Sequence, residues 1–120
     1  MNAVNLEEKF SRLQSYWKPA IVGELNDSYV KVVKISGEFI WHHHDGEDEL
    51  FWVVRGKMRM RFRDRDVIVS PGEFIVVPKG VEHLPMSEGG ETHVVLLEPK
   101  TTLNTGNVRN ERTVPVLDRL

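Results

Sequence analysis

The sequence contains no cysteine among its 120 residues. This absence excludes disulfide bonds, thiolate metal sites and a cysteine nucleophile, and it suits a reducing compartment such as the cytoplasm. Long hydrophobic runs are also missing, because apolar stretches such as Phe74–Pro78 are far shorter than the ~20 residues of a membrane span. Met1–Glu8 has neither the basic nor the apolar part of a signal peptide. We therefore expect a cytoplasmic protein without membrane contact.

A strong charge of either sign is absent as well, since the formal net charge is −2. This balance gives no support for binding to nucleic acid or to a membrane surface. What is present is an ordinary globular composition, with 40% hydrophobic and 28% charged residues. A chain of 120 residues fits one compact domain. We expect a single domain whose partner is a small molecule.

Residues 1–19 are typical of a short helix that packs on the rest of the domain. Asn5 is suited to cap this helix, and a glutamate three residues later completes a capping-box pattern. Lys18-Pro19 ends the helix, because a residue before proline avoids the helical backbone conformation. The helix presents one apolar stripe at helical spacing, which consists of Leu6, Phe10, Leu13 and Trp17.

Residues 20–99 consist of short apolar or alternating stretches separated by turn residues, which is typical of β-strands. The alternation is clearest in Lys57–Arg63, where Met58, Met60 and Phe62 face one side and charged residues the other. Many short strands without helices between them predict an all-β, antiparallel sandwich or barrel. The polar residues 100–120 are expected to form an extended C-terminal arm. The predicted strands are Ala20–Leu25, Tyr29–Ile35, Glu38–His44, Glu49–Val54, Lys57–Arg63, Val67–Ser70, Phe74–Val77, Val81–Met86 and His93–Glu98.

The most informative stretch is Trp41–Glu49, which contains three consecutive histidines. Side chains alternate along a strand, so His42 and His44 face one side and His43 faces the other. The Cα atoms of His42 and His44 are then ~6.6 Å apart, and two imidazoles at that separation can converge on one metal ion. A turn follows, and Glu49 opens the next strand beside the two histidines.

His83 adds a fourth metal-binding group from a separate part of the chain. It follows Pro78-Lys79-Gly80, whose rigid turn suits a side chain that must point in one direction. Three neutral nitrogens and one anionic oxygen suit one divalent ion of Fe, Mn, Ni, Co or Zn, and they leave positions open for water or substrate. The predicted metal ligands are His42, His44, Glu49 and His83.

Two motifs in this region resemble those of the cupin superfamily. The first motif is matched by Gly37, His42, His44, Glu49 and Gly56, and the second by Gly72, Pro78, Gly80 and His83. The gap from Gly37 to His42 is one residue shorter than the common pattern, and Ser87 stands where the second motif often ends in Asn. The whole chain looks like the small single-domain cupins of bacteria. This resemblance implies a jelly-roll β-barrel with the metal inside its mouth and the four named residues as ligands.

Four further residues are candidates for contact with a substrate, namely Phe51, Met58, Met60 and His93. In a small barrel the inward face near the metal is both core and pocket wall, so the two methionines can serve as both. His93 is either an ordinary strand residue or a substrate contact. No separate general base stands out, and Glu49 and His93 are the only candidates, so the catalytic residues stay unassigned.

Two classes of function fit these residues. The first is a metal-dependent enzyme, of dioxygenase, isomerase or lyase type, that acts on a small oxygen-bearing substrate in the barrel. The alternative is a binding module that holds a small ligand without turnover. Fold and ligand set do not choose among the reactions. The apolar helix stripe and the strand edges are poor surfaces to expose to water, and a second copy of the chain can cover them. We therefore predict a homodimer.

Overall fold

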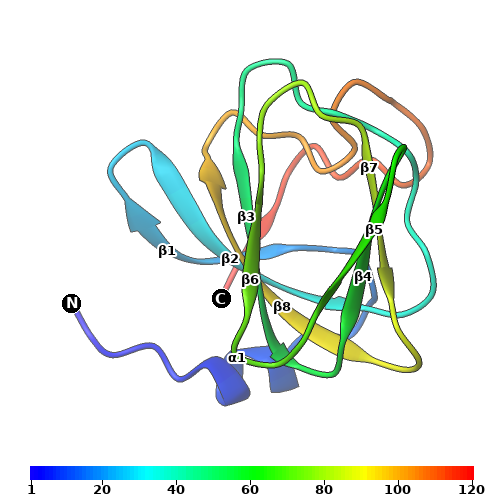
Figure 1. The fold of residues 1–120 in the computed structure, drawn as a ribbon. Helices are drawn as coiled ribbons and strands as arrows, with labels where there is room; N and C mark the ends of the chain where they lie inside the picture. Colours follow the sequence, from blue (N-terminus) through cyan, green and yellow to red (C-terminus); the bar gives the residue numbers. More distant parts are fainter.

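The computed structural model describes all residues, Met1–Leu120, as two β-sheets and one short helix (Figure 1). The larger sheet has six strands in the order β6-β3-β8-β2-β1-β9, and the smaller has three in the order β5-β4-β7. No helix of the structure is long and apolar enough to cross a membrane. The elements are α1 (Leu6–Ser11), β1 (Ala20–Leu25), β2 (Ser28–Ile35), β3 (Glu49–Arg55), β4 (Met58–Phe62), β5 (Asp66–Val69), β6 (Phe74–Val77), β7 (His83–Ser87), β8 (Thr92–Pro99) and β9 (Asp118–Arg119).

The hydrophobic core lies between the two sheets, which confirms the predicted double-sheet jelly-roll. Its buried side chains come from β2, β3, β6 and β8 of the larger sheet and from β4 and β5 of the smaller one. Strand β4 shows the alternation that produces this core. Met58 and Met60 are fully buried, whereas Arg59 between them points outward and pairs with Glu88 and Asp66.

The helix is shorter than predicted. Asn5 caps it as expected, since its side chain accepts a hydrogen bond from the backbone N–H of Glu8, but the helix ends at Ser11 rather than at Lys18-Pro19. Leu6, Phe10 and Leu13 pack on Val32 and Val95 of the larger sheet. This contact lies on the face of the sheet opposite the main core.

Trp17 does not belong to the helix stripe, so this part of the prediction is wrong. Its backbone N–H donates to the carbonyl of Lys34, and its indole N–H donates to the carbonyl of Ser36. Its φ of 61° turns the chain toward the core, where the ring stacks on Phe39. These tertiary contacts outweigh the helical periodicity of the sequence.

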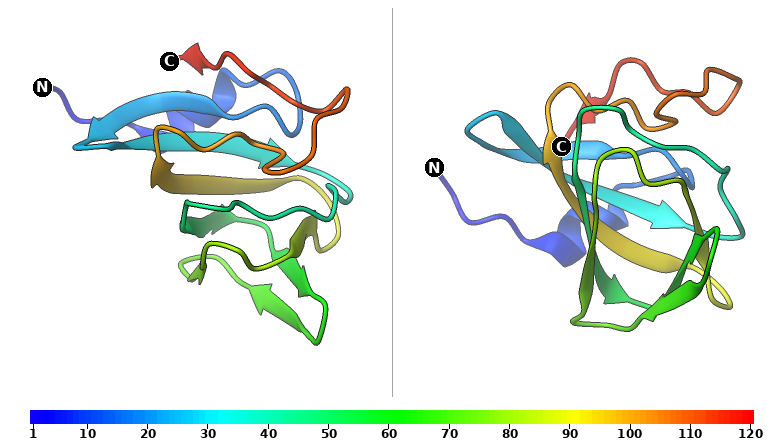
Figure 2. Two further views of the ribbon diagram at one scale, coloured as in Figure 1. Left: turned by 90° about the horizontal axis from the view of Figure 1, so that it is seen from above. Right: turned by 45° about the horizontal axis from the view of Figure 1, so that its top comes forward.

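Most predicted strands are present with slightly shifted ends, but Glu38–His44 is not a strand. This segment makes only two isolated bridges, Glu38 with Met86 and His42 with His83. A second difference concerns residues 100–120, which are not an extended arm. Their chain folds back over the loop that carries the histidines and ends in β9, which pairs in parallel with β1 (Figure 2).

Candidate metal centre

His42, His44, Glu49 and His83 form one buried group, as the sequence predicts. His42 and His44 come from the loop between β2 and β3. Glu49 is the first residue of β3, and His83 is the first residue of β7. Each residue offers one ligand atom, and these four atoms all lie within 4.8 Å of one another. The group therefore has the composition and the spacing of a site that could bind one metal ion.

Backbone hydrogen bonds hold the histidines in place. The backbone N–H of His42 donates to the carbonyl of His83 at 3.1 Å, and the N–H of His83 donates back to the carbonyl of His42 at 2.9 Å. This reciprocal pair sets the two imidazole rings with centroids 4.3 Å apart. The N–H of Gly80, in the turn before His83, donates to the carbonyl of His44 at 2.7 Å. The turn Pro78-Lys79-Gly80 thus precedes one candidate ligand, His83, and holds the backbone of another, His44.

Hydrogen bonds of the ring nitrogen Nδ1 set the ring orientation of His42 and His83. Nδ1 of His42 lies 2.9 Å from the carbonyl oxygen of Ile40, and Nδ1 of His83 lies 2.9 Å from that of Val81. A carbonyl oxygen can only accept, so Nδ1 carries the hydrogen in both neutral rings. The lone pair of each ring is then on Nε2, which faces the centre of the group.

Three polar atoms of the group lie close together at this centre. Oε1 of Glu49 lies 2.9 Å from Nε2 of His44 and 3.3 Å from Nε2 of His83. Neither contact has the geometry of a hydrogen bond, so these three buried atoms have no hydrogen-bond partner. Buried polar atoms are rarely left unpaired in this way. Three electron-pair donors that point at one place fit a cation held between them.

Burial and local charge set the protonation of the site. Burial, followed by the charge of His83, lowers the pKa of His42 from 6.5 to about 4. Burial alone raises the pKa of Glu49, but contacts with Glu98, His44 and His83 outweigh it and hold this pKa well below its usual range. At neutral pH His42 is therefore neutral and Glu49 is ionised, which are the forms that bind a divalent cation.

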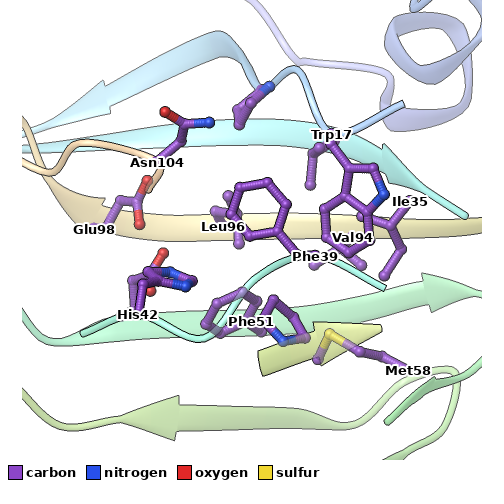
Figure 3. A pocket seen from close by; sticks show the side chains of 14 residues that line it. Trp17, Ile35, Phe39, His42, Phe51, Met58, Val94, Leu96, Glu98 and Asn104 are labelled. Carbon is purple, nitrogen blue, oxygen red and sulfur yellow. The ribbon is translucent and has the colours of Figure 1, made fainter. Parts of the chain in front are cut away.

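A pocket with a volume of about 40 Å³ lies beside the group and is lined by two of its members, His42 and Glu49. Figure 3 shows His42, Glu98 and Asn104 at one end of this pocket, and Trp17, Ile35 and Met58 toward the other. The rings of Phe39 and Phe51 lie between the two ends. The pocket thus has one polar end, next to the candidate ligands, and one apolar end.

The other predicted site residues have different places in the structure. Phe51 and Met58 line the pocket, whereas Met60 is buried in the core and is not part of the lining. The structure does not bring His93 to the pocket either. Its ring stacks on Phe10 of the helix, with centroids 4.6 Å apart, on the opposite face of the larger sheet. His43 also points away from the group, and its Nε2 lies 2.9 Å from Oδ1 of Asp45.

The sequence analysis missed a buried ion pair next to the site. Nζ of Lys31 lies 2.7 Å from Oε1 of Glu98, and both side chains are only 2% exposed. Burial, followed by the charge of Glu49, raises the pKa of Glu98 well above its usual range. Strand alternation could have revealed the pair, because Lys31 shares its face of β2 with Val33, and Glu98 shares its face of β8 with Leu96.

Comparison with known proteins places this fold and site in a family. The family model described as a cupin domain matches residues 29–99. Among curated proteins, the chain is 35% identical over 63 residues to the uncharacterized protein YdbB of Bacillus subtilis. That match covers 52% of this chain and 56% of YdbB, so the chain spans about half the length of this relative.

Solved structures agree with the family match. A cupin-2 domain containing protein from Shewanella frigidimarina is 41% identical with a TM-score of 0.78, and the match covers 81% of this chain and 94% of that one. Protein NMB1881 from Neisseria meningitidis is 32% identical with a TM-score of 0.75, over 82% of this chain and 100% of that one. KdgF from Halomonas sp. is 25% identical with a TM-score of 0.61, over 68% and 79% of the two chains. The protein therefore belongs to the cupin domain family.

Proposed function

We propose that this cupin holds one divalent transition-metal ion and acts as a metal-dependent enzyme on a small oxygen-bearing substrate. The proposed metal ligands are His42, His44, Glu49 and His83. The observation that carries the proposal is the convergence of buried nitrogen and oxygen atoms that have no hydrogen-bond partner. Three imidazoles and one carboxylate suit Fe(II), Mn(II), Ni(II), Co(II) or Zn(II).

The chain's own residues account for binding and for the shape of the site. A bound metal would act as a Lewis acid toward an oxygen of the substrate. His42 and Glu49 line the pocket as well as belonging to the ligand group, so a substrate in the pocket lies against them. Phe39 and Phe51 make the space beside these residues apolar. Oxygenation, isomerisation and elimination are the reaction classes that fit this arrangement.

The test is the metal content of protein purified without a polyhistidine tag and without added metal. We expect about one ion per chain in the wild type and a small fraction of that in His83→Ala. His93→Ala is the matched control, because it also removes a strand histidine but lies outside the group. A wild-type protein that takes up none of the five metals on reconstitution would contradict the proposal.

Metal identity then separates an enzyme from a binding module. Redox-active Fe(II) together with oxygen uptake in the presence of small hydroxylated or carbonyl compounds supports an oxygenase. A tightly held Zn(II) with no exchangeable water supports a module that binds a ligand without turnover. Water exchange at the metal can be measured by paramagnetic relaxation after substitution with Co(II) or Mn(II).

A further inference from the structure

We infer that Glu98 is a second polar contact for the substrate, and that the pocket takes a small hydroxy-carbonyl compound. Its carbonyl oxygen would face the four-residue ligand group, its hydroxyl group would bond to Glu98, and its carbon tail would point to the apolar end. This inference rests on the metal site proposed above, and it assigns the class of ligand that this site accepts.

The first observation is that Glu98 is held in place yet incompletely bonded. Lys31 contacts Oε1 of Glu98 at 2.7 Å, and this contact fixes the carboxyl group in one orientation. The other oxygen, Oε2, is buried and has no hydrogen-bond partner. A buried ion pair is costly to desolvate, and a buried oxygen without a partner adds to that cost. A ligand that bonds to Oε2 would offset it.

The second observation is the place of Glu98 in the pocket. Its side chain is part of the pocket lining, at the same end as His42 and Asn104 (Figure 3). Both polar atoms of the Asn104 side chain already have a partner, because Oδ1 accepts from the backbone N–H of Val114 and Nδ2 donates to the carbonyl of Arg112. Outside the ligand group, Oε2 of Glu98 is therefore the buried polar atom of this lining that has no partner.

The third observation concerns the chemistry that Glu98 would accept. A hydroxyl group both donates and accepts, so it pairs with a carboxyl group whether or not that group carries a proton. The pocket volume of about 40 Å³ suits a small ligand.

A different role for Glu98 makes a different prediction. Glu98 also contacts Glu49, so it could serve only to orient that metal ligand. In that case its loss changes metal affinity but not the preference of the pocket for a hydroxyl group. The two roles are separated when metal binding and ligand preference are measured independently.

The experiment compares hydroxyacetone with butanone, which has a methyl group in place of the hydroxyl. Binding to the zinc-loaded protein is followed by NMR shifts of the Val94 and Leu96 methyl groups, which line the pocket. We expect hydroxyacetone to bind about tenfold more tightly, the ratio that corresponds to ~1.4 kcal/mol. In the double variant Lys31→Met/Glu98→Leu the ratio falls to about one. This variant should fold, because apolar residues can replace a buried ion pair without loss of stability.

The matched control is Glu24→Leu/Lys100→Met, which makes the same kinds of substitution in an exposed ion pair 2.9 Å long. It keeps the tenfold ratio. Equal binding of both compounds to the wild type, no binding of either, or a ratio that survives in the double variant would overturn the inference. If the double variant does not fold, the NMR shift of the Glu98 carboxyl carbon is measured in the wild type instead. The inference requires that this shift responds to hydroxyacetone and not to butanone.

Zinc content is measured separately for every variant. If the wild type binds no zinc, the proposed metal function fails, and the same two titrations on the metal-free protein decide the role of Glu98. If zinc binds but both compounds bind equally, the metal function stands and the inference about Glu98 fails.

Discussion

The three consecutive histidines differ in the surroundings of each side chain. His42 and His44 are almost fully buried and belong to the group of four candidate ligands. His43 is partly exposed and contacts Asp45, outside that group. Such a difference between neighbours follows from the alternation of an extended chain, even though this segment forms no regular strand.

Single alanine substitutions of the three histidines should therefore have different effects on metal binding. We expect His42→Ala and His44→Ala to reduce the metal content to a small fraction, because each removes one of only four ligands. His43→Ala should keep its metal and change the free energy of unfolding by no more than about 1 kcal/mol. The measurement is metal per chain, with circular dichroism to confirm folding. Metal loss in His43→Ala together with retention in His42→Ala would contradict the assignment.

The lowered pKa of His42 predicts a pH dependence of the metal-free protein. Burial lowers the pKa of the His42 imidazole to about 4 in the folded state, from its ordinary value of 6.5 in the unfolded chain. Between these values the unfolded chain binds a proton that the folded chain does not, so stability falls as pH decreases. This loss amounts to about 3 kcal/mol of unfolding free energy at this residue.

Urea unfolding of the metal-free protein at neutral pH and near pH 4 measures this effect. Other groups titrate in the same range, so the wild type is compared with His42→Gln, whose side chain does not titrate. The variant should lose about 3 kcal/mol less than the wild type over this range. Identical pH dependence of the two proteins would show that His42 is not buried in a neutral form.

At the scale of elements, the C-terminal segment braces the loop that carries the histidines. The backbone N–H of His43 donates to Oδ1 of Asn107 at 2.9 Å, and the N–H of Asn107 donates to the carbonyl of His43 at 3.0 Å. Gly106 lies directly against the same carbonyl, so a Cβ atom there would collide with it. The loop thus depends on residues that follow the cupin motifs in sequence.

Substitution of Gly106 should expose this dependence. Gly106→Ala combines a left-handed backbone, at φ +57°, with the collision against His43, and we expect a loss of about 3 kcal/mol of unfolding free energy together with weaker metal binding. Gly72→Ala is the control, because Gly72 has a φ of +86° but open space around it. It should cost only about 1 kcal/mol and leave metal affinity unchanged. Equal effects of the two substitutions would mean that the segment does not brace the loop.

The elements that could be predicted from the sequence are those with a local pattern. The alternation in β4 and the turns around it indicated strand positions, and the motif spacing indicated which four side chains meet. The histidine loop, Trp17 and the C-terminal segment were mispredicted, because their conformations depend on contacts between residues far apart in sequence. Trp17, for example, leaves the helix to bond to Lys34 and Ser36. Glu98 was missed although alternation places it on the buried face of its strand.

At the scale of the whole molecule, the surface differs from the one expected from the sequence. The helix stripe was one reason to predict a homodimer, but the structure covers Leu6, Phe10 and Leu13 with the chain's own sheet. A different apolar surface stays exposed along β3 and the edge strand β6. Phe74 is 62% exposed, Val76 47% and Trp52 44%, and we call these three residues the edge patch.

The edge patch is the surface through which we expect the homodimer to form. Trp52 and Phe74 are direct partners in the pairing of β3 with β6, so they lie side by side on one face of the sheet, next to the unpaired edge of β6. Light scattering at micromolar concentration should give about twice the 13.9 kDa of one chain. Phe74→Arg should give the mass of a monomer, because it places a charge in the buried part of the interface. Leu25→Arg, at an exposed apolar residue of β1, should stay dimeric. A monomeric wild type, or a dimer that survives Phe74→Arg, would contradict this prediction.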